Sequence, residues 1–259
     1  MLVADRDLAE LDRLLRRIDE LARPVSLATL GGFRPSDDPH ASWMAGVGCG
    51  RADEEPPAVN GEVMVPILQI NVAELPSVPD AMADLALVVV WMSEHFQFES
   101  GQFTGCDHDR YGGEYRSQYS GWAVREYASL DGLLPQIDRR KHPRRHDDRF
   151  GPRPYPVRWT RMDDEWPSLI DAAKQIPELR GWLRDPAFDT QIRERRDNQC
   201  MGTKVGGYPF TIQTGFDGME DFVLQIDGDV KANIWWLGGG LAYFCRSSTG
   251  EWMVEVQND

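Results

Sequence analysis

VGGYP at residues 205–209 and VLQID at residues 223–227 set the expected fold, because both have counterparts earlier in the chain. LGGF at residues 30–33 precedes ILQIN at residues 67–71 in the same order. An apolar run follows each Leu-Gln-Ile, at 85–91 in the first half and at 241–245 in the second. A repeated order of three signals is typical of internal duplication. We therefore expect two related halves with pseudo-twofold symmetry.

The spacing between these signals differs in the two halves. The stretch from the Gly-Gly pair to Leu-Gln-Ile is about twice as long in the first half as in the second. The extra residues lie in 34–60, which is rich in Gly, Pro and charge. Surface loops accommodate such insertions because a longer loop adds little closure entropy. The length difference therefore does not argue against duplication.

Hydrophobic periodicity predicts two helical segments and a series of strands. A stripe of Leu and Ile at helical spacing predicts an N-terminal helix over 5–22, which Pro24 ends. Residues 164–196 are expected to be helical with breaks. Strands are expected at 64–72, 85–91, 210–213, 222–227, 241–246 and, as an edge strand, 252–256. The predicted fold class is α+β, with internally duplicated antiparallel β-sheets, flanking helices and a pseudo-twofold, two-lobed arrangement.

The chain is expected to be a single compact unit over 1–259. Its first repeat covers about 25–137 and its second about 162–259. The connector between them, 138–161, is rich in Arg and Pro, and its nine basic residues oppose three acidic ones. A solvated connector, a patch that pairs with the acidic body and a polyanion-binding segment all remain open for it.

The composition limits the partners that we expect. The formal net charge is −14 at pH 7, and phosphate recognition needs a positive face, so nucleic acid is not expected as a ligand. An acidic surface suits a soluble protein or attraction to a basic protein partner. No run approaches the roughly 20 apolar residues of a membrane helix, and a charged N-terminus does not resemble a secretion signal. We expect a cytoplasmic protein with four scattered, unpaired cysteines.

No catalytic motif, cofactor site or metal site follows from the sequence, and the oligomeric state stays open. Gly-Val-Gly-Cys-Gly at 46–50 resembles part of a dinucleotide loop, but Arg51 stands where a third Gly is wanted. The metal-capable residues at 106–109 lack a second Cys/His pair at standard spacing, and Pro143 separates His142 from His146. Glu94-His95 follows a buried strand, where a strand-end role is the simpler interpretation.

Two glutamines occupy matching positions in the expected repeats. Gln69 and Gln225 each lie between apolar neighbours in a strand, so each amide needs hydrogen-bond partners. One interpretation is structural, with each amide bonded to backbone or to its counterpart. The other interpretation is functional, with the two glutamines lining a cleft between the halves together with Asn71, Asp227 and Trp236.

Several of these motifs resemble the YwqG-like family of uncharacterised bacterial proteins. The resemblance rests on residues 204–209 (KVGGYP), on 224–227, on Trp236 with 240–244, and on 68–71 with 74–76 in the first half. Arg34 stands where the family has a first-half proline, and Trp236-Leu237-Gly238 replaces its Trp-Gly-Asp triplet. The resemblance implies a duplicated α+β fold with antiparallel sheets, no established catalysis and a link to bacterial toxin–immunity neighbourhoods.

These observations lead to two hypotheses of function. The first is a non-enzymatic protein-binding module, such as an immunity-like inhibitor of a basic toxin. The alternative is an enzyme or small-ligand binder that uses the cleft between the repeats.

Overall fold

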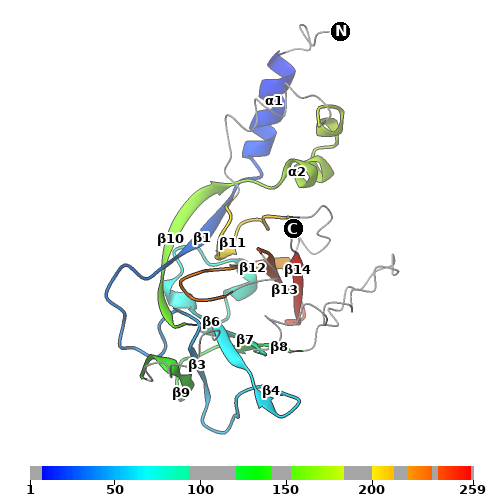
Figure 1. Ribbon diagram of the computed structural model, residues 1–259. Coiled ribbons are helices and arrows are strands. Elements are labelled where there is room, and N and C mark those ends of the chain that lie inside the picture. Colours follow the sequence, from blue (N-terminus) through cyan, green and yellow to red (C-terminus); the bar gives the residue numbers. More distant parts are fainter. Residues whose placement is uncertain are drawn as a thin grey trace.

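The computed structural model describes residues 8–93, 121–141, 153–183, 200–212, 221–234 and 239–257. Its main feature is one ten-stranded antiparallel sheet (Figure 1). The strands of this sheet are β1 (Arg23–Leu30), β2 (Trp43–Met44), β6 (Val65–Asn71), β7 (Leu87–Met92), β8 (Trp122–Tyr127), β10 (Tyr155–Glu165), β11 (Lys204–Gly206), β12 (Phe222–Asp227), β13 (Leu241–Arg246) and β14 (Trp252–Gln257). Their spatial order is β14-β13-β12-β11-β1-β10-β2-β6-β7-β8.

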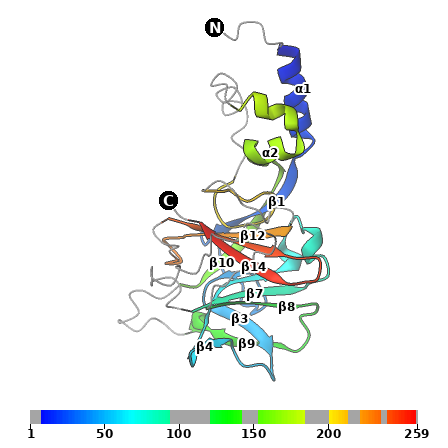
Figure 2. The same ribbon diagram turned by 90° about the vertical axis from the view of Figure 1, so that its right-hand side faces the viewer.

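The predicted α+β class with flanking helices is wrong. The protein is mostly β, and its sheet curls into a nearly closed, barrel-like form. The helices α1 (Leu8–Asp19) and α2 (Leu169–Gln175) extend away from the sheet (Figures 1 and 2). Leu14 and Ile18 of α1 pack against Ala172 and Leu179, so the helical stripe is buried against the other helical segment and not against the sheet. Periodicity shows that a helix has an apolar face but not what covers that face.

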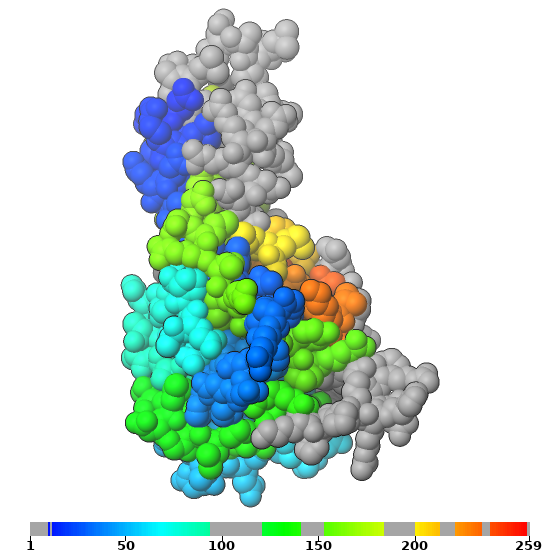
Figure 3. Space-filling view, turned by 90° about the vertical axis from the view of Figure 1, so that its left-hand side faces the viewer, coloured from blue at the N-terminus to red at the C-terminus, as the bar shows by residue number. Residues whose placement is uncertain are grey.

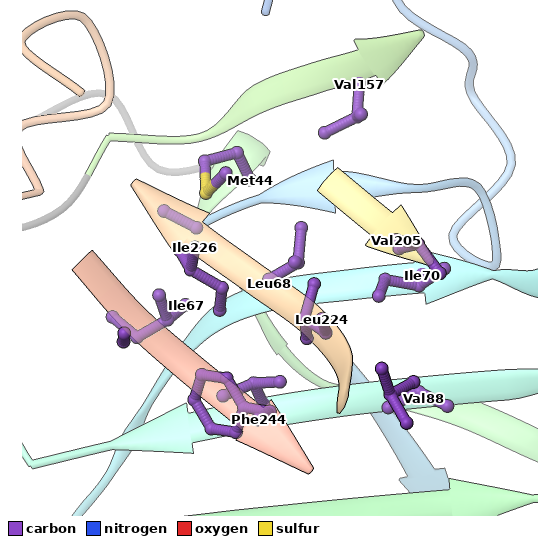
Figure 4. Close-up of a cluster of buried hydrophobic side chains, with 14 of the residues drawn as sticks. Met44, Ile67, Leu68, Ile70, Val88, Val157, Val205, Leu224, Ile226 and Phe244 are labelled. Carbon is purple, nitrogen blue, oxygen red and sulfur yellow. The ribbon is translucent and has the colours of Figure 1, made fainter. Parts of the chain in front are cut away.

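The expected two-lobed arrangement is also wrong, because strands of both halves share one sheet. β1 pairs with β10 on one side and with β11 on the other. The main core lies inside the curled sheet, where Leu68 of β6 and Leu224 of β12 face each other (Figure 4). Arg246 of β13 forms a bidentate ion pair with Glu126 of β8 at 2.9 and 3.0 Å, which joins the two ends of the sheet.

The halves of this single sheet repeat the same hydrogen bonds. The amide of Ala28 in β1 donates to Thr203 O at 2.9 Å, and the amide of Val157 in β10 donates to Ser42 O at 3.1 Å. Thr203 directly precedes β11, and Ser42 directly precedes β2. β1 therefore corresponds to β10 and β11 to β2, and the same relation matches β12, β13 and β14 with β6, β7 and β8.

This correspondence corrects the alignment of the glycine pairs. Gly206-Gly207 follows Thr203 at the same distance as Ala45-Gly46 follows Ser42. All four of these residues have positive φ, at 78° and 69° in the second half and at 57° and 74° in the first. Gly31-Gly32 is therefore not the counterpart of Gly206-Gly207. With Ala45-Gly46 as the reference, the difference in spacing to Leu-Gln-Ile becomes small.

The individual elements agree with most of the expected strands. The strands near 64–72, 85–91, 222–227 and 241–246 are present, and β14 is an edge strand as predicted. The N-terminal helix ends at Asp19, and residues 155–161 of the expected connector belong to β10. Residues 210–212 form no strand. The described residues also form two separate two-stranded sheets: β3 (Val47–Arg51) with β9 (Leu133–Asp138), and the hairpin of β4 (Ala58–Val59) with β5 (Glu62–Val63). No helix in the described ranges is long and apolar enough to cross a membrane.

Candidate functional site

A cavity of about 130 Å³ lies where β1 meets the loops that precede β11 and follow β12. Figure 3 shows these segments side by side, with β1 in blue, residues 200–212 in yellow and residues 221–234 in orange. The lining residues are Ala28, Leu30, Gly202, Thr203, Asp227, Gly228, Asp229 and Lys231. The volume equals that of about four waters and is well below the roughly 300 Å³ at which drug-sized ligand pockets begin. The cavity can therefore admit the end of one side chain or a very small molecule.

Gln225 holds the backbone next to this cavity. Its Nε2 donates to Gly202 O at 2.9 Å, and its Oε1 accepts the amide of Phe210 at 2.8 Å. Two positions further along β12, the amide of Asp227 donates to Thr203 Oγ1 at 3.1 Å. These bonds fix the loop before β11 against the end of β12. They place Asp227 in the lining, while Gln225 itself is fully buried beneath it.

Gln69 has the matching role in the other half of the sheet. Its Oε1 accepts the amide of Cys49 at 2.9 Å, and its Nε2 donates to Pro39 O and Ala41 O at 2.7 and 2.9 Å. Asn71 accepts the amide of Ala73 through Oδ1. The glutamines thus follow the structural interpretation, in which each buried amide is bonded to backbone of its own half. Of the expected cleft residues that the structure describes, Asp227 lines the cavity and Gln69 and Asn71 do not.

Differences in side-chain size between the two halves explain why the cavity is open in the second half. Trp159 of β10 occupies the position that corresponds to Leu30 of β1, and its indole Nε1 donates to Ser42 Oγ at 3.0 Å. At three further positions the first half also has the larger side chain. Val157 corresponds to Ala28, Ala41 to Gly202 and Val72 to Gly228. Larger side chains therefore fill this space in the first half, and smaller ones leave it open in the second.

The cavity also differs from its counterpart in charge. Asp227 corresponds to Asn71, and Asp229 corresponds to Ala73, so the two carboxylates belong to the second half alone. Burial raises the pKa of Asp227, and the nearby Asp229 adds to this effect, while backbone amides of Gly228 and Gly202 oppose it. A raised pKa means that the site lacks full compensation for this negative charge.

The described part of the chain supplies no ion pair to either carboxylate. Asp229 Oδ1 accepts the amide of Ala232 at 2.8 Å. Lys231 is exposed, and its Nζ lies 3.4 Å from Leu30 O. Among the described residues no salt bridge joins Lys231 or any other cation to Asp227 or Asp229. The arrangement suits a small cationic group that can approach both carboxylates.

A second buried polar cluster is fully satisfied and serves the fold. Lys204 Nζ lies 2.5 Å from Glu165 Oε1 and donates to Cys200 O at 2.9 Å, and both charged side chains are fully buried. Glu165 also accepts the amides of Cys200 and Tyr208 at 3.0 and 2.9 Å. A Cβ on Gly207 would overlap Glu165 Oε2. This ion pair therefore fixes the tight turn after β11. Sequence reasoning missed it because Glu165 lies far from Lys204 along the chain.

The remaining sequence candidates carry no site in the described structure. Trp236, Glu94, His95, the metal-capable residues at 106–109 and His142 with His146 lie outside the described residues. Gly48, within the stretch that resembles a dinucleotide loop, is required by packing, because a Cβ there would lie 2.5 Å from the ring of Trp91. In the described ranges, no group of three His, Cys, Asp or Glu residues could hold a metal ion.

Comparison with known proteins adds no relative to this description. No protein-family model matches the chain, and no curated protein matches it.

Proposed function

We propose that this protein is a cytoplasmic, non-enzymatic binding module for a basic protein, as an immunity-like inhibitor of a basic toxin would be. The resemblance to the YwqG-like family supports this class of function. The structural observation that supports it most directly is the small cavity in which Asp227 and Asp229 have no ion-pair partner among the described residues. Buried or partly buried carboxylates without a cation are costly, and a partner that supplies the cation removes that cost.

The charge of the whole chain supports the same partner. With a net charge of −14, the protein attracts a basic surface over long range, and such attraction accelerates encounter. Cys49 and Cys200 carry free thiols, which suits a reducing compartment. Electrostatic steering falls with ionic strength because salt screens charges over about 10 Å at 0.1 M.

Capture from the native host tests this proposal. The tagged protein is immobilised, incubated with host lysate at low salt and eluted with a salt gradient, and an unrelated protein of similar negative charge serves as the control bait. We expect one stoichiometric basic protein that the control bait does not retain. Its association rate with the purified protein should then fall steeply with rising salt. Capture by both baits alike, or an association rate that salt does not change, would contradict the proposal.

A further inference from the structure

The geometry points to the cavity beside β1 as a receptor for the guanidinium group of one arginine side chain, presented by a protein partner. The inference deepens the proposed function and rests on it for the source of the arginine. The pocket is defined by the eight lining residues given above, and we refer to it as the β1 pocket.

The two halves of the sheet differ at the β1 pocket. Both halves keep the same framework, in which a hydroxyl before the short strand accepts an amide from the end of the next strand: Thr203 Oγ1 from Asp227, and Ser42 Oγ from Asn71 at 3.0 Å. Among the described residues, the second-half version of this framework has both an open cavity and two carboxylates in its lining. Trp159 both fills the first-half site and satisfies its hydroxyl. The β1 pocket therefore differs from the filled first-half site in open space and in negative charge, and a cationic ligand needs both.

Several hydrogen-bond acceptors surround the opening of the pocket. Asp227 and Asp229 belong to the lining, and so does Lys231, whose Nζ lies 3.4 Å from Leu30 O and shows that a cation can reach this carbonyl. A guanidinium has five N–H donors in one plane and can bond several acceptors at once, whereas an ammonium offers three donors around a point. Guanidinium is also more weakly hydrated, so entry into a half-buried site costs less.

The size of the pocket fits the end of one side chain. A cavity of about 130 Å³ has room for one planar head group and part of its aliphatic stem, and Ala28 and Leu30 offer that stem an apolar wall. A metabolite of ordinary size would have most of its atoms outside. The geometry therefore favours a side chain whose remaining contacts are made by the surface of a protein.

A peptide titration followed by NMR tests the β1 pocket directly. The probe is acetyl-Gly-Arg-Gly-amide, and the readout is the shift of backbone amides at Gly202, Gly228 and Asp229 against those of the rest of the sheet. The same peptide with citrulline keeps the shape and removes the charge, the peptide with lysine changes the head group, and free L-arginine removes the peptide context. We expect saturable binding with a Kd on the order of 1 mM for the arginine peptide, as a few charge-assisted hydrogen bonds provide.

Two variants change the pocket in different ways. Asp227→Asn gives this position the residue of the first half and should weaken binding of the arginine peptide by about tenfold or more. Leu30→Trp fills the cavity as Trp159 does and should abolish the local shifts. Asp131→Asn removes one charge from an exposed position elsewhere and should leave binding within about twofold. If Leu30→Trp does not fold, Asp227→Asn, which keeps the side-chain shape, still decides the outcome.

The outcomes separate this inference from the proposed function. Equal binding of the citrulline peptide, equal weakening by Asp131→Asn, or equal affinity for free L-arginine would overturn the assignment of the pocket to an arginine side chain of a protein. A basic partner captured with unchanged affinity by Asp227→Asn and Leu30→Trp would overturn the inference while leaving the proposed function in place. Peptide binding at the pocket without any captured partner would do the reverse.

Discussion

Replacement of Lys204 by Met tests the role of the buried ion pair in the fold. Met matches the unbranched Lys side chain as far as Cε, so the substitution mainly removes the ammonium group and its charge. The Glu165 carboxylate, 2.5 Å from Lys204 Nζ, would then be buried without a cation, and Cys200 O would lose its donor. Removing one partner of a buried pair costs about 3–5 kcal/mol. That is a large fraction of the roughly 5–15 kcal/mol by which domains are stable.

The assay is urea unfolding at pH 7, followed by circular dichroism, with the free energy of unfolding taken at an unchanged denaturant slope. Lys174→Met is the matched control, because Lys174 pairs with Asp171 at 3.0 Å while its own side chain is 49% exposed. Water reaches the Lys174 end of this pair although Asp171 is buried, so the control should lose clearly less stability than Lys204→Met. If the two variants lose the same stability within about 1 kcal/mol, the structural role assigned to the Lys204–Glu165 pair is wrong.

Three further changes are informative. Gly207→Ala should lower the free energy of unfolding by more than Gly32→Ala does, because both positions have positive φ (69° and 77°) but only the former would overlap Glu165; equal losses in urea unfolding would show that strain alone matters. Gln225→Leu should destabilise by about 1–3 kcal/mol, since it leaves two partly buried backbone groups, Gly202 O and the Phe210 amide, without their partner; a neutral result would show that water replaces the Gln225 amide. The pKa of Asp227 is raised in the folded state, so folding binds protons and stability falls as pH rises from the ordinary carboxyl range through the raised pKa. Asp227→Asn should therefore unfold at a higher temperature than the wild type near pH 7 and lose that advantage at low pH; a constant difference across pH would refute the assigned direction.

Local patterns in the sequence were sufficient for most of the strands. Alternating and continuous apolar residues located β6, β7, β12 and β13, because the hydrophobic pattern of adjacent residues indicates which faces of a strand are buried. The Leu-Gln-Ile repeat identified matching positions, and both glutamines proved to be buried amides bonded to backbone. The requirement that a buried polar group be satisfied made this interpretation available without a structure.

The pairing of strands was not available in the same way. Gly31-Gly32 has the letters of Gly206-Gly207, whereas the true counterpart, Ala45-Gly46, shares its backbone conformation and not its letters. Equivalence in a fold is defined by φ, ψ and hydrogen bonds, and a non-glycine residue can adopt positive φ where its surroundings support it. Identical residues can therefore stand at positions that do not correspond in the fold.

The sequence by itself determined the strand-rich segments, the N-terminal helix, the acid excess and the polar positions that repeat, because each depends on residues that are close along the chain. The tertiary structure alone decided that the helices pack on each other, that both halves form one curled sheet, and that Lys204 meets Glu165. It also decided that the β1 pocket stays open, since Leu30 and Asp227 are brought together only by strand pairing. The physical reason is that long-range contacts depend on which apolar faces find each other, and many pairings satisfy the same local pattern.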